Sequence, residues 1–385
     1  MKYLRNPAGS TGKSVEMVAG IQVLRAVAVL VVTICHAQFE VSRIGELPAA
    51  MPAAALDGLA GFGVQLFFVI SGFVMVYSSE PLFGTRRGPF IFLERRLVRI
   101  VPLYWIVTTI YLALTLLVTK FDKGYPFSFV LASYLFVPAA RPDGVIEPLV
   151  GQGWSLNYEM LFYFVFALTV GSVRRASVAI VTTVLVAAVA AGQMVHPLPF
   201  VISVWAVPLL LYFVFGMWIG LAYREGLCLT PVQGLGLIGI GCVLLFVQFY
   251  WAPETTAFGV AIWAIPALMV AGASLPRPSL KGPFWSTVMV IGAASYALYL
   301  FHAIPIRTLF LLARWIGFDL GRDTLAYVCA AVLISIILAI AIYYLVERPL
   351  LKALRWRNPA KSPRLVANSL DQSAIALVRR AEERA

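Results

Sequence analysis

The sequence predicts an all-α integral membrane protein, a single bundle of about ten transmembrane helices, and two observations support this fold class. Of the 385 residues, 61% are hydrophobic and only 12% are charged, with a mean hydropathy of +0.88, whereas a soluble domain has about 25% charged residues. The hydrophobic residues also form runs of about 20, which at 1.5 Å per helical residue cross roughly 30 Å of hydrocarbon. Such a chain has too little polar surface to face water on all sides.

Ten apolar runs predict the transmembrane helices. In chain order they cover residues 19–39, 58–78, 100–119, 154–171, 176–195, 200–222, 233–251, 257–272, 289–312 and 324–346. The apolar stretch at 127–140 is too short to span and is interrupted by Pro138, so we expect it to lie at the outer interface or to fold back into a cavity. No linker or internal repeat divides the runs, which predicts one membrane domain over residues 1–350.

The basic residues predict that both termini are cytoplasmic. Lys and Arg concentrate in cytoplasmic loops. With the N-terminus inside, the cytoplasmic segments hold 22 of the 30 Lys and Arg, the outer loops hold 6, and Arg25 and Arg307 lie within spans. The net charge of +12 then follows from orientation and from contact with anionic lipid headgroups, and we expect no nucleic acid partner.

Residues 351–385 predict a cytoplasmic basic tail. Its first residues are rich in Lys, Arg and Trp, which is typical of an interfacial anchor. Residues 369–385 place apolar side chains on one stripe, which predicts a short amphipathic helix. The four cysteines lack the spacing of metal ligands, so we expect neither a disulfide nor a metal site.

Ionisable side chains at membrane depth cost about 2.5 kcal/mol or more near the centre, so they indicate where function lies. Arg25 and His36 lie in the first span, where about 100° per residue places them within roughly 20° of one face and about 16 Å apart. The helix rise puts Arg25 about 6 Å and Ser71 about 12 Å above the inner surface. His302 comes at about 20 Å, and His36 and Glu159 both come at about 22 Å.

A histidine and a carboxylate at matching depth suit a general base and its orienting partner, because a carboxylate fixes the imidazole tautomer. The residues leave two interpretations of His36 and Glu159 open, namely this pair or interhelical hydrogen bonds that only hold the bundle together. His302 is open in the same way, because Tyr296, Tyr299 and His302 recur as a stripe that packing alone explains equally well.

A basic segment that contains Arg95, Arg96 and Arg99 leads into the third span, with Pro102 expected in its first helical turn. Arg96 and Arg99 are one turn apart on the same side. Such a fork suits a polyphosphate, because guanidinium binds phosphate in a planar, bidentate way. The alternative is anchoring at the inner surface by positive charge and anionic lipid.

Six motifs follow one another over most of residues 20–350. They are Arg25, ten residues and then His36; Ser71-Gly72-Phe73; RRLVRIVPLY at 95–104; WSLNYE at 154–159; SYALYLFH at 295–302; and Glu347-Arg348-Pro349. Together they resemble the acyltransferase-3 family of membrane acyltransferases, and in particular the branch that acetylates bacterial exopolysaccharide. An acidic residue is common in that family where this chain has Gln65.

The resemblance implies transfer of an acyl group, usually acetyl, from a CoA thioester in the cytoplasm to a hydroxyl of a polysaccharide or lipid-linked sugar. It implies His36 as the catalytic histidine with Arg25 as its partner, and Arg96 and Arg99 as contacts for the CoA phosphates. It also implies a multi-pass protein of the bacterial inner membrane. Acetyl-CoA is therefore the expected donor, no metal is expected, and a homo-oligomer is left open.

The residues can be assembled into one path for the acyl group. In this hypothesis His36 takes the proton from an acceptor hydroxyl, Glu159 steadies the imidazolium, and Arg25 or Ser71 stabilises the oxyanion. The residues expected to bind acyl-CoA are Arg95, Arg96, Arg99 and Ser71. Residues of the later motifs are expected to contact the substrate: Trp154, Tyr158, Tyr299 and His302.

Two alternatives accompany this hypothesis. Because His36 lies about 22 Å from the inner surface, an extended pantetheine arm needs an inward funnel to reach it, and a relay through a covalent acyl-enzyme stays open. From a different class, a transporter or flippase could use Arg25, His36, Glu159 and His302 as a polar path. The missing repeats and the cytoplasmic arginine fork disfavour a transporter.

Overall fold

The computed structural model describes residues 18–42, 53–118, 125–195, 197–250, 259–277, 280–320 and 322–356. Within these ranges the chain forms helices joined by turns and irregular segments, without a strand. This confirms the predicted all-α class. The amphipathic helix predicted at 369–385 lies outside the described ranges.

Fifteen α-helices are described. In chain order they are α1 (Ala19–Ser42), α2 (Ala53–Ser78), α3 (Gly88–Val118), α4 (Phe127–Tyr134), α5 (Trp154–Thr169), α6 (Arg174–Met194), α7 (Phe200–Trp205), α8 (Leu211–Arg224), α9 (Pro231–Tyr250), α10 (Gly259–Ser274), α11 (Pro283–Ala293), α12 (Ser295–Phe301), α13 (Ala303–Trp315), α14 (Thr324–Ile342) and α15 (Arg348–Trp356).

Six helical segments of the described chain are long and apolar enough to cross a membrane: α1, α2, α3, α6, α9 and the continuous segment from α14 into α15. The pair α11 and α12, bent by 55°, counts as a seventh if it forms one span. The remaining predicted spans correspond to shorter or broken helices, since α5 has 16 residues and the run at 200–222 is divided between α7 and α8. Several candidate spans are therefore confirmed, whereas ten crossings and cytoplasmic termini stay predictions.

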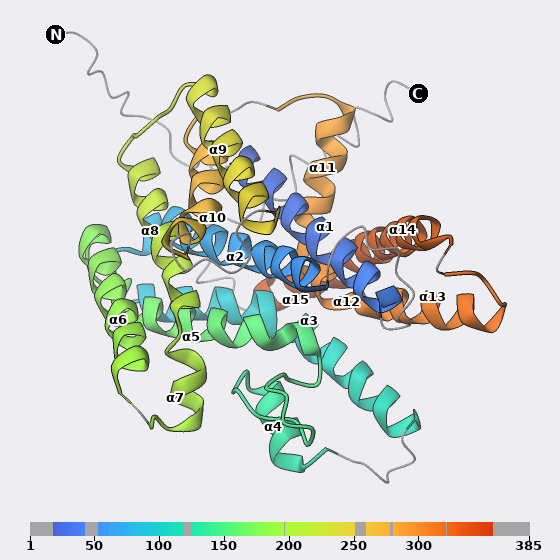
Figure 1. The fold of residues 1–385 in the computed structure, drawn as a ribbon. Helices are drawn as coiled ribbons and strands as arrows, with labels where there is room; N and C mark the ends of the chain where they lie inside the picture. Colours follow the sequence, from blue (N-terminus) through green and yellow to red (C-terminus); the bar gives the residue numbers. More distant parts are fainter. Residues whose placement is uncertain are drawn as a thin grey trace.

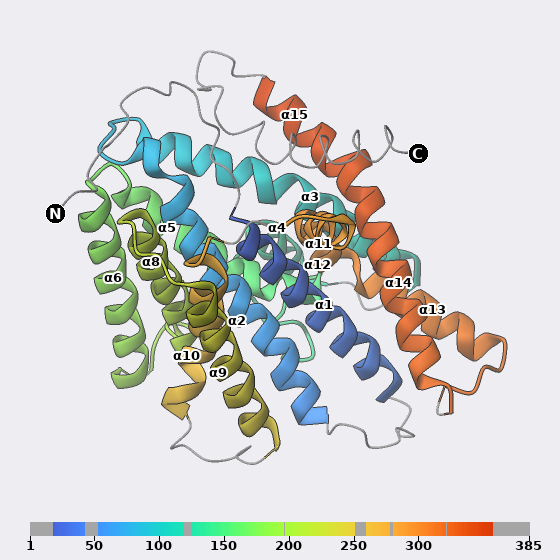
Figure 2. The same cartoon turned by 90° about the horizontal axis from the view of Figure 1, so that it is seen from above.

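The central helix of the bundle is α1, which lies between α2 and α14 (Figure 2). On the other side of α2, α8 packs against it, and α6 covers α8 at the edge of the molecule (Figure 1). The first predicted span thus lies between other helices rather than at the periphery of the bundle.

Two glycines explain why α2 and α8 approach so closely. A Cβ atom at Gly72 would overlap the carbonyl oxygen of Phe213, and one at Gly216 would overlap the carbonyl oxygen of Val69. Small residues at helix interfaces let backbones come into contact in membranes, where dispersion contacts rather than water exclusion drive association. The glycine of the Ser71-Gly72-Phe73 motif therefore has a packing role.

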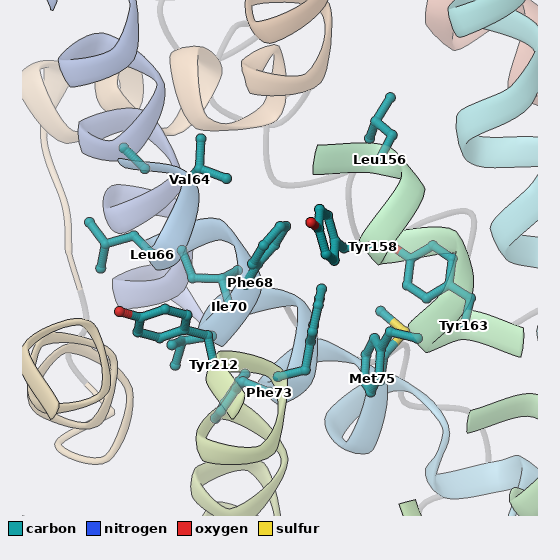
Figure 3. Close-up of a cluster of buried hydrophobic side chains, with 14 of the residues drawn as sticks. Val64, Leu66, Phe68, Ile70, Phe73, Met75, Leu156, Tyr158, Tyr163 and Tyr212 are labelled. Atoms are coloured by element: carbon teal, nitrogen blue, oxygen red, sulfur yellow. The ribbon is translucent and has the colours of Figure 1, made fainter. Parts of the chain in front are cut away.

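The core beside this interface is aromatic. Phe68 and Phe73 on α2 point towards Tyr158 and Tyr163 on α5, with Tyr212 of α8 on the other side of α2 (Figure 3). Phe73 is fully buried, and its ring packs against neighbouring tyrosine rings. Such offset and edge-to-face pairs add about 0.5–1.5 kcal/mol each beyond the area that they bury.

The third helix begins earlier than predicted, at Gly88, because the basic segment is itself helical. Pro102 consequently lies inside α3, and the prediction that it occupies the first turn is wrong. The helical segment does confirm that Arg96 and Arg99 share one side, since both line the same cavity.

The short apolar stretch after α3 folds back along it. The hydroxyl of Tyr104 donates to the carbonyl of Ser133 at 3.1 Å, and the indole of Trp105 donates to the carbonyl of Tyr134 at 2.9 Å. Because Tyr104 and Trp105 lie near the middle of α3, α4 lies alongside that helix rather than extending away from its end. The two positions predicted for residues 127–140, at the outer interface or within a cavity, stay predictions.

Candidate functional site

A cavity lies between α1, α2, α3, α5 and α12 and has about 830 Å³ of empty space, including the part that opens to solvent. One side of the lining is apolar, with Phe67, Phe68 and Ile100 among its residues. The polar lining consists of three arginines, one carboxylate and six hydroxyl groups: Arg25, Arg96, Arg99, Glu159, Ser71, Ser155, Tyr163, Ser295, Tyr296 and Tyr299.

Each arginine of the cavity is held by a contact from another helix. Arg25 Nη2 donates to Ser295 Oγ at 2.9 Å, where the chain bends between α11 and α12. Arg96 Nη2 donates to Ser78 Oγ at 2.6 Å, at the end of α2. The Arg96 guanidinium also lies 5.4 Å from the ring centroid of Phe92. These contacts fix two cationic groups and involve four helices, α1, α2, α3 and α12.

Arg99 is held by an acidic residue for which the sequence analysis proposed no catalytic or binding role. Its Nη1 atom lies 3.8 Å from Oε1 of Glu347, a residue that is 1% exposed. Among the described residues neither oxygen of Glu347 accepts a hydrogen bond. Glu347 belongs to a π-helical turn, Tyr343–Glu347, at the end of α14, and such turns are frequent at functional sites.

Glu159 forms the acidic centre of the cavity. It accepts hydrogen bonds from Ser71 Oγ, at 2.8 Å, and from the hydroxyl of Tyr163. Ser155, Glu159 and Tyr163 recur every four residues along α5, so they form one polar stripe on an otherwise apolar helix. This spacing is visible in the sequence and would have identified Ser155 and Tyr163 as site residues, which the sequence analysis missed.

The depth predicted for Glu159 is corrected by the point at which α5 begins. Gln152 Nε2 donates to the carbonyl of Leu300 at 2.8 Å, so the start of α5 lies beside the end of α12. Glu159 lies seven residues further along, about 10 Å deeper by the helix rise. The hydrogen bond from Ser71 Oγ, at 2.8 Å, places Glu159 beside Ser71 and not beside His36.

His36 lies outside the cavity lining. Its Nδ1 atom is 2.8 Å from the carbonyl oxygen of Val32, which can only accept, so Nδ1 carries a hydrogen and the neutral ring has its lone pair on Nε2. The orienting partner of the imidazole is therefore a backbone carbonyl, and the described contacts do not pair it with Glu159. The unprotonated Nε2 is the form that a general base requires.

The side chain of His36 is exposed, and it lies on the side of α1 opposite to the exposed apolar residues of that helix. The exposed apolar residues Val27 and Ile34 lie about 180° and 160° from His36 around the helix. Val29 and Val32, which lie on the side of His36, are buried. The imidazole therefore points away from the exposed apolar side of α1 and lies against the ring of His302.

Two residues of the SYALYLFH motif separate the cavity from His36. Tyr299 lines the cavity, and its hydroxyl donates to the carbonyl of Gln152 and shares a 2.7 Å hydrogen bond with Ser155. The ring of His302 is 6.3 Å from that of Tyr299 and 5.0 Å from that of His36. Tyr299 and His302 thus lie between the cavity and His36, with Tyr299 on the side of the cavity and His302 on the side of His36.

Four residues predicted to contact the donor or the acceptor are not brought to the cavity: His302, which lies behind Tyr299, and Arg95, Trp154 and Tyr158. Arg95 lies on α3 but is absent from the lining. Trp154 packs edge-on against Tyr158, and the hydroxyl of Tyr158 donates to the carbonyl of Val204 at 2.8 Å. Tyr158 therefore joins α5 to α7 and Trp154 packs against it, and their predicted substrate contacts are not supported by this geometry.

The charges around the cavity favour an anionic ligand. Arg25, Arg96 and Arg99 carry three positive charges, against two negative charges on Glu159 and Glu347 when both are ionised. Guanidinium groups present several N–H donors in a fixed plane, which matches phosphate oxygens. The remaining hydroxyl groups can bind the polar part of an uncharged chain attached to such an anion.

Comparisons with known proteins agree with this geometry. The model of a family described as "Acyltransferase domain" (Acyl_transf_3) matches residues 18–344. Over 308 residues the chain is 34% identical to "Exopolysaccharide production protein ExoZ" of Rhizobium meliloti (strain 1021), covering 77% of this chain and 91% of that protein. It is 26% identical over 371 residues to "Acyltransferase MdmB" of Streptomyces mycarofaciens, covering 87% and 92%. No solved structure matches significantly. The chain therefore belongs to the acyltransferase-3 family, and the protein is a membrane acyltransferase.

Proposed function

We propose that the protein transfers an acetyl group from cytoplasmic acetyl-CoA to a hydroxyl of a polysaccharide or lipid-linked sugar, with His36 as general base. The similarity to an exopolysaccharide production protein supports a carbohydrate acceptor. The proposal includes cytoplasmic termini and a location in the bacterial inner membrane, because the basic loops then face the cytoplasm.

The observation that carries the proposal is the convergence of Arg25, Arg96 and Arg99 on one cavity. These residues come from two helices far apart in the sequence, and each is held by a contact from a further element. Anchoring to lipid explains arginines at the surface of a membrane helix, but it gives no reason for them to line an internal cavity. An acyl donor that carries phosphates gives that reason.

In the transfer step His36 Nε2 takes the proton of the acceptor hydroxyl while its oxygen attacks the carbonyl carbon of the thioester. The new C–O bond forms, the C–S bond breaks, and the CoA thiolate leaves and takes up the proton from the imidazolium. Glu159 acts in the donor cavity, where it fixes the hydroxyls of Ser71 and Tyr163. General base catalysis of this kind contributes about 100- to 10,000-fold.

Two routes bring the acyl group to His36. In direct transfer the thioester passes Tyr299, which separates the cavity from the imidazole. In a relay the acyl group first forms a covalent bond to a residue of the cavity, CoA leaves, and the acceptor then receives the group. Incubation of purified protein with radiolabelled acetyl-CoA, without acceptor, separates the routes: a labelled protein after denaturation supports the relay, and its consistent absence supports direct transfer.

The variant His36→Ala tests the assignment of the base. We expect ester on the surface polysaccharide to fall at least 100-fold, measured as base-labile acetate from cells that produce the variant at normal abundance. Thr33→Ala is a matched control, because its side chain also hydrogen-bonds a carbonyl one turn earlier in α1, at 2.8 Å to Val29. Unchanged ester content in His36→Ala would refute the assignment, whereas equal losses in both variants would indicate damage to the helix.

A further inference from the structure

Two pairs of polar side chains lie in contact where α1 ends and α13 begins, His36 with His302 and Glu40 with Arg307. His36 and Glu40 lie one turn apart on α1. His302 precedes α13, and its ring lies 5.0 Å from that of His36. One turn further along α1, Arg307 Nη1 donates to Oε1 of Glu40. The ion pair thus lies about 6 Å beyond the proposed base, on the side away from the donor cavity.

The two members of this ion pair differ in exposure. The side chain of Glu40 is 12% exposed, whereas that of Arg307 is 51% exposed. The guanidinium also lies over the ring of Phe310, with 5.4 Å between Cζ and the ring centroid. Among the described residues, Glu40 is the hydrogen-bond acceptor of Arg307, and it takes one of the five N–H donors of that group. The carboxylate and the ring therefore hold the guanidinium with donors left for a ligand.

The need to hold α1 against α13 does not by itself explain this ion pair. An apolar cluster already joins these elements, with Ala37, Val41, Ile306 and Phe310 among its buried residues. A partly exposed ion pair adds only about 0–1 kcal/mol to stability. A half-exposed arginine next to an exposed imidazole is, in contrast, a suitable arrangement for binding a polar substrate.

We propose that Glu40 and Arg307 form a subsite for the sugar acceptor, an inference that rests on the function proposed above. Arg307 donates hydrogen bonds to oxygen atoms of the sugar next to the hydroxyl that faces His36, and Glu40 holds the guanidinium in place. Because the pair carries no net charge, the subsite suits a neutral polyhydroxyl ring better than an anionic one.

The test is a measurement of acceptor and donor kinetics in Arg307→Lys and Arg307→Gln. The full-length protein in lipid vesicles receives radiolabelled acetyl-CoA and the polysaccharide of the source cells after mild alkaline removal of its esters. Lysine keeps the charge and the pairing with Glu40 but loses the planar donor set. We expect both variants to raise the KM for polysaccharide about tenfold, with the affinity for acetyl-CoA unchanged.

Arg314→Gln is the matched control, because Arg314 lies on the same helix and also approaches the ring of Phe310, at 6.0 Å. It should leave both constants unchanged. An unchanged KM for polysaccharide in folded Arg307→Lys and Arg307→Gln overturns the subsite while leaving the proposed function intact. A failure of the unaltered protein to transfer acetyl from acetyl-CoA overturns the proposed function, and the subsite with it.

Discussion

Neighbouring arginines on α3 provide the most direct test of the donor cavity. Arg95 and Arg96 have the same charge and adjacent positions, but only Arg96 lines the cavity. If these residues serve only to anchor the helix at the inner surface, replacing either with glutamine has the same effect. If the cavity binds acyl-CoA, Arg96→Gln weakens donor binding and Arg95→Gln does not.

The expected magnitude follows from the geometry of Arg96. Its guanidinium is already fixed by the Ser78 hydroxyl and by the ring of Phe92, so little ordering is required when a phosphate binds. Hydrogen bonds to charged groups are worth about 1.5–3 kcal/mol, which corresponds to about 10- to 150-fold in the dissociation constant. The lost Ser78 bond costs about 0.5–1.5 kcal/mol of stability, a small part of the 5–15 kcal/mol typical of a folded domain.

The assay is binding of radiolabelled acetyl-CoA to purified protein, together with the KM for acetyl-CoA in the transfer reaction. We expect the Kd to rise by about 10- to 150-fold in Arg96→Gln and by less than about threefold in Arg95→Gln, where only long-range charge is lost. Gel filtration confirms that both variants are folded. Equal effects in the two variants would refute the assignment of this cavity to the donor and would favour lipid anchoring.

Two further predictions concern packing and the acidic centre. Gly72→Ala places a Cβ against the carbonyl of Phe213, so we expect about 1–3 kcal/mol of destabilisation and a lower unfolding temperature in detergent. Gly61→Ala, on the same helix with nothing within 4 Å of the new Cβ, should leave that temperature unchanged or slightly raised, and similar losses in both would contradict the packing. Glu159→Gln removes the negative charge that accepts hydrogen bonds from the hydroxyls of Ser71 and Tyr163. We expect at least about tenfold slower acyl transfer, with donor binding unchanged or tighter. Glu225→Gln breaks an exposed ion pair and should retain full activity; normal transfer by Glu159→Gln would exclude the acidic centre from the reaction.

The sequence was sufficient to predict the inward face of the first helix. Helix periodicity alone places Arg25 and His36 on one stripe, and the structure buries Val29 and Val32 on that stripe while exposing Val27 on the other side. Long apolar runs likewise predicted the helices that exceed 18 residues. Both predictions succeed because they depend on local geometry, which the sequence carries directly.

Depth within the bundle required tertiary contacts that periodicity does not contain. The height of Glu159 was predicted by assuming that its helix starts at the outer surface, but the bond from Gln152 to Leu300 places that start beside the end of α12. The sharp bend before Ser295 brings its hydroxyl to Arg25, and apolar composition gives no sign of such a bend. The face on which a residue of an unbroken helix lies is therefore predictable, whereas its level relative to residues beyond a folded-back loop is not.

Tyr299 lies between the cavity proposed for the acyl donor and the proposed base, so it matters for either route of the acyl group. The donor cavity ends at Tyr299, and the ring of this residue faces His302, which in turn contacts His36. Its hydroxyl is held by the carbonyl of Gln152 and by Ser155, so α5 and α12 close around it. A thioester that moves directly to the base has to displace this ring, whereas a relay needs only the smaller acyl group to pass. Both hydrogen bonds of Tyr299 come from the turn that begins α5, so the start of that helix fixes the side chain that any transfer from the cavity to His36 has to pass.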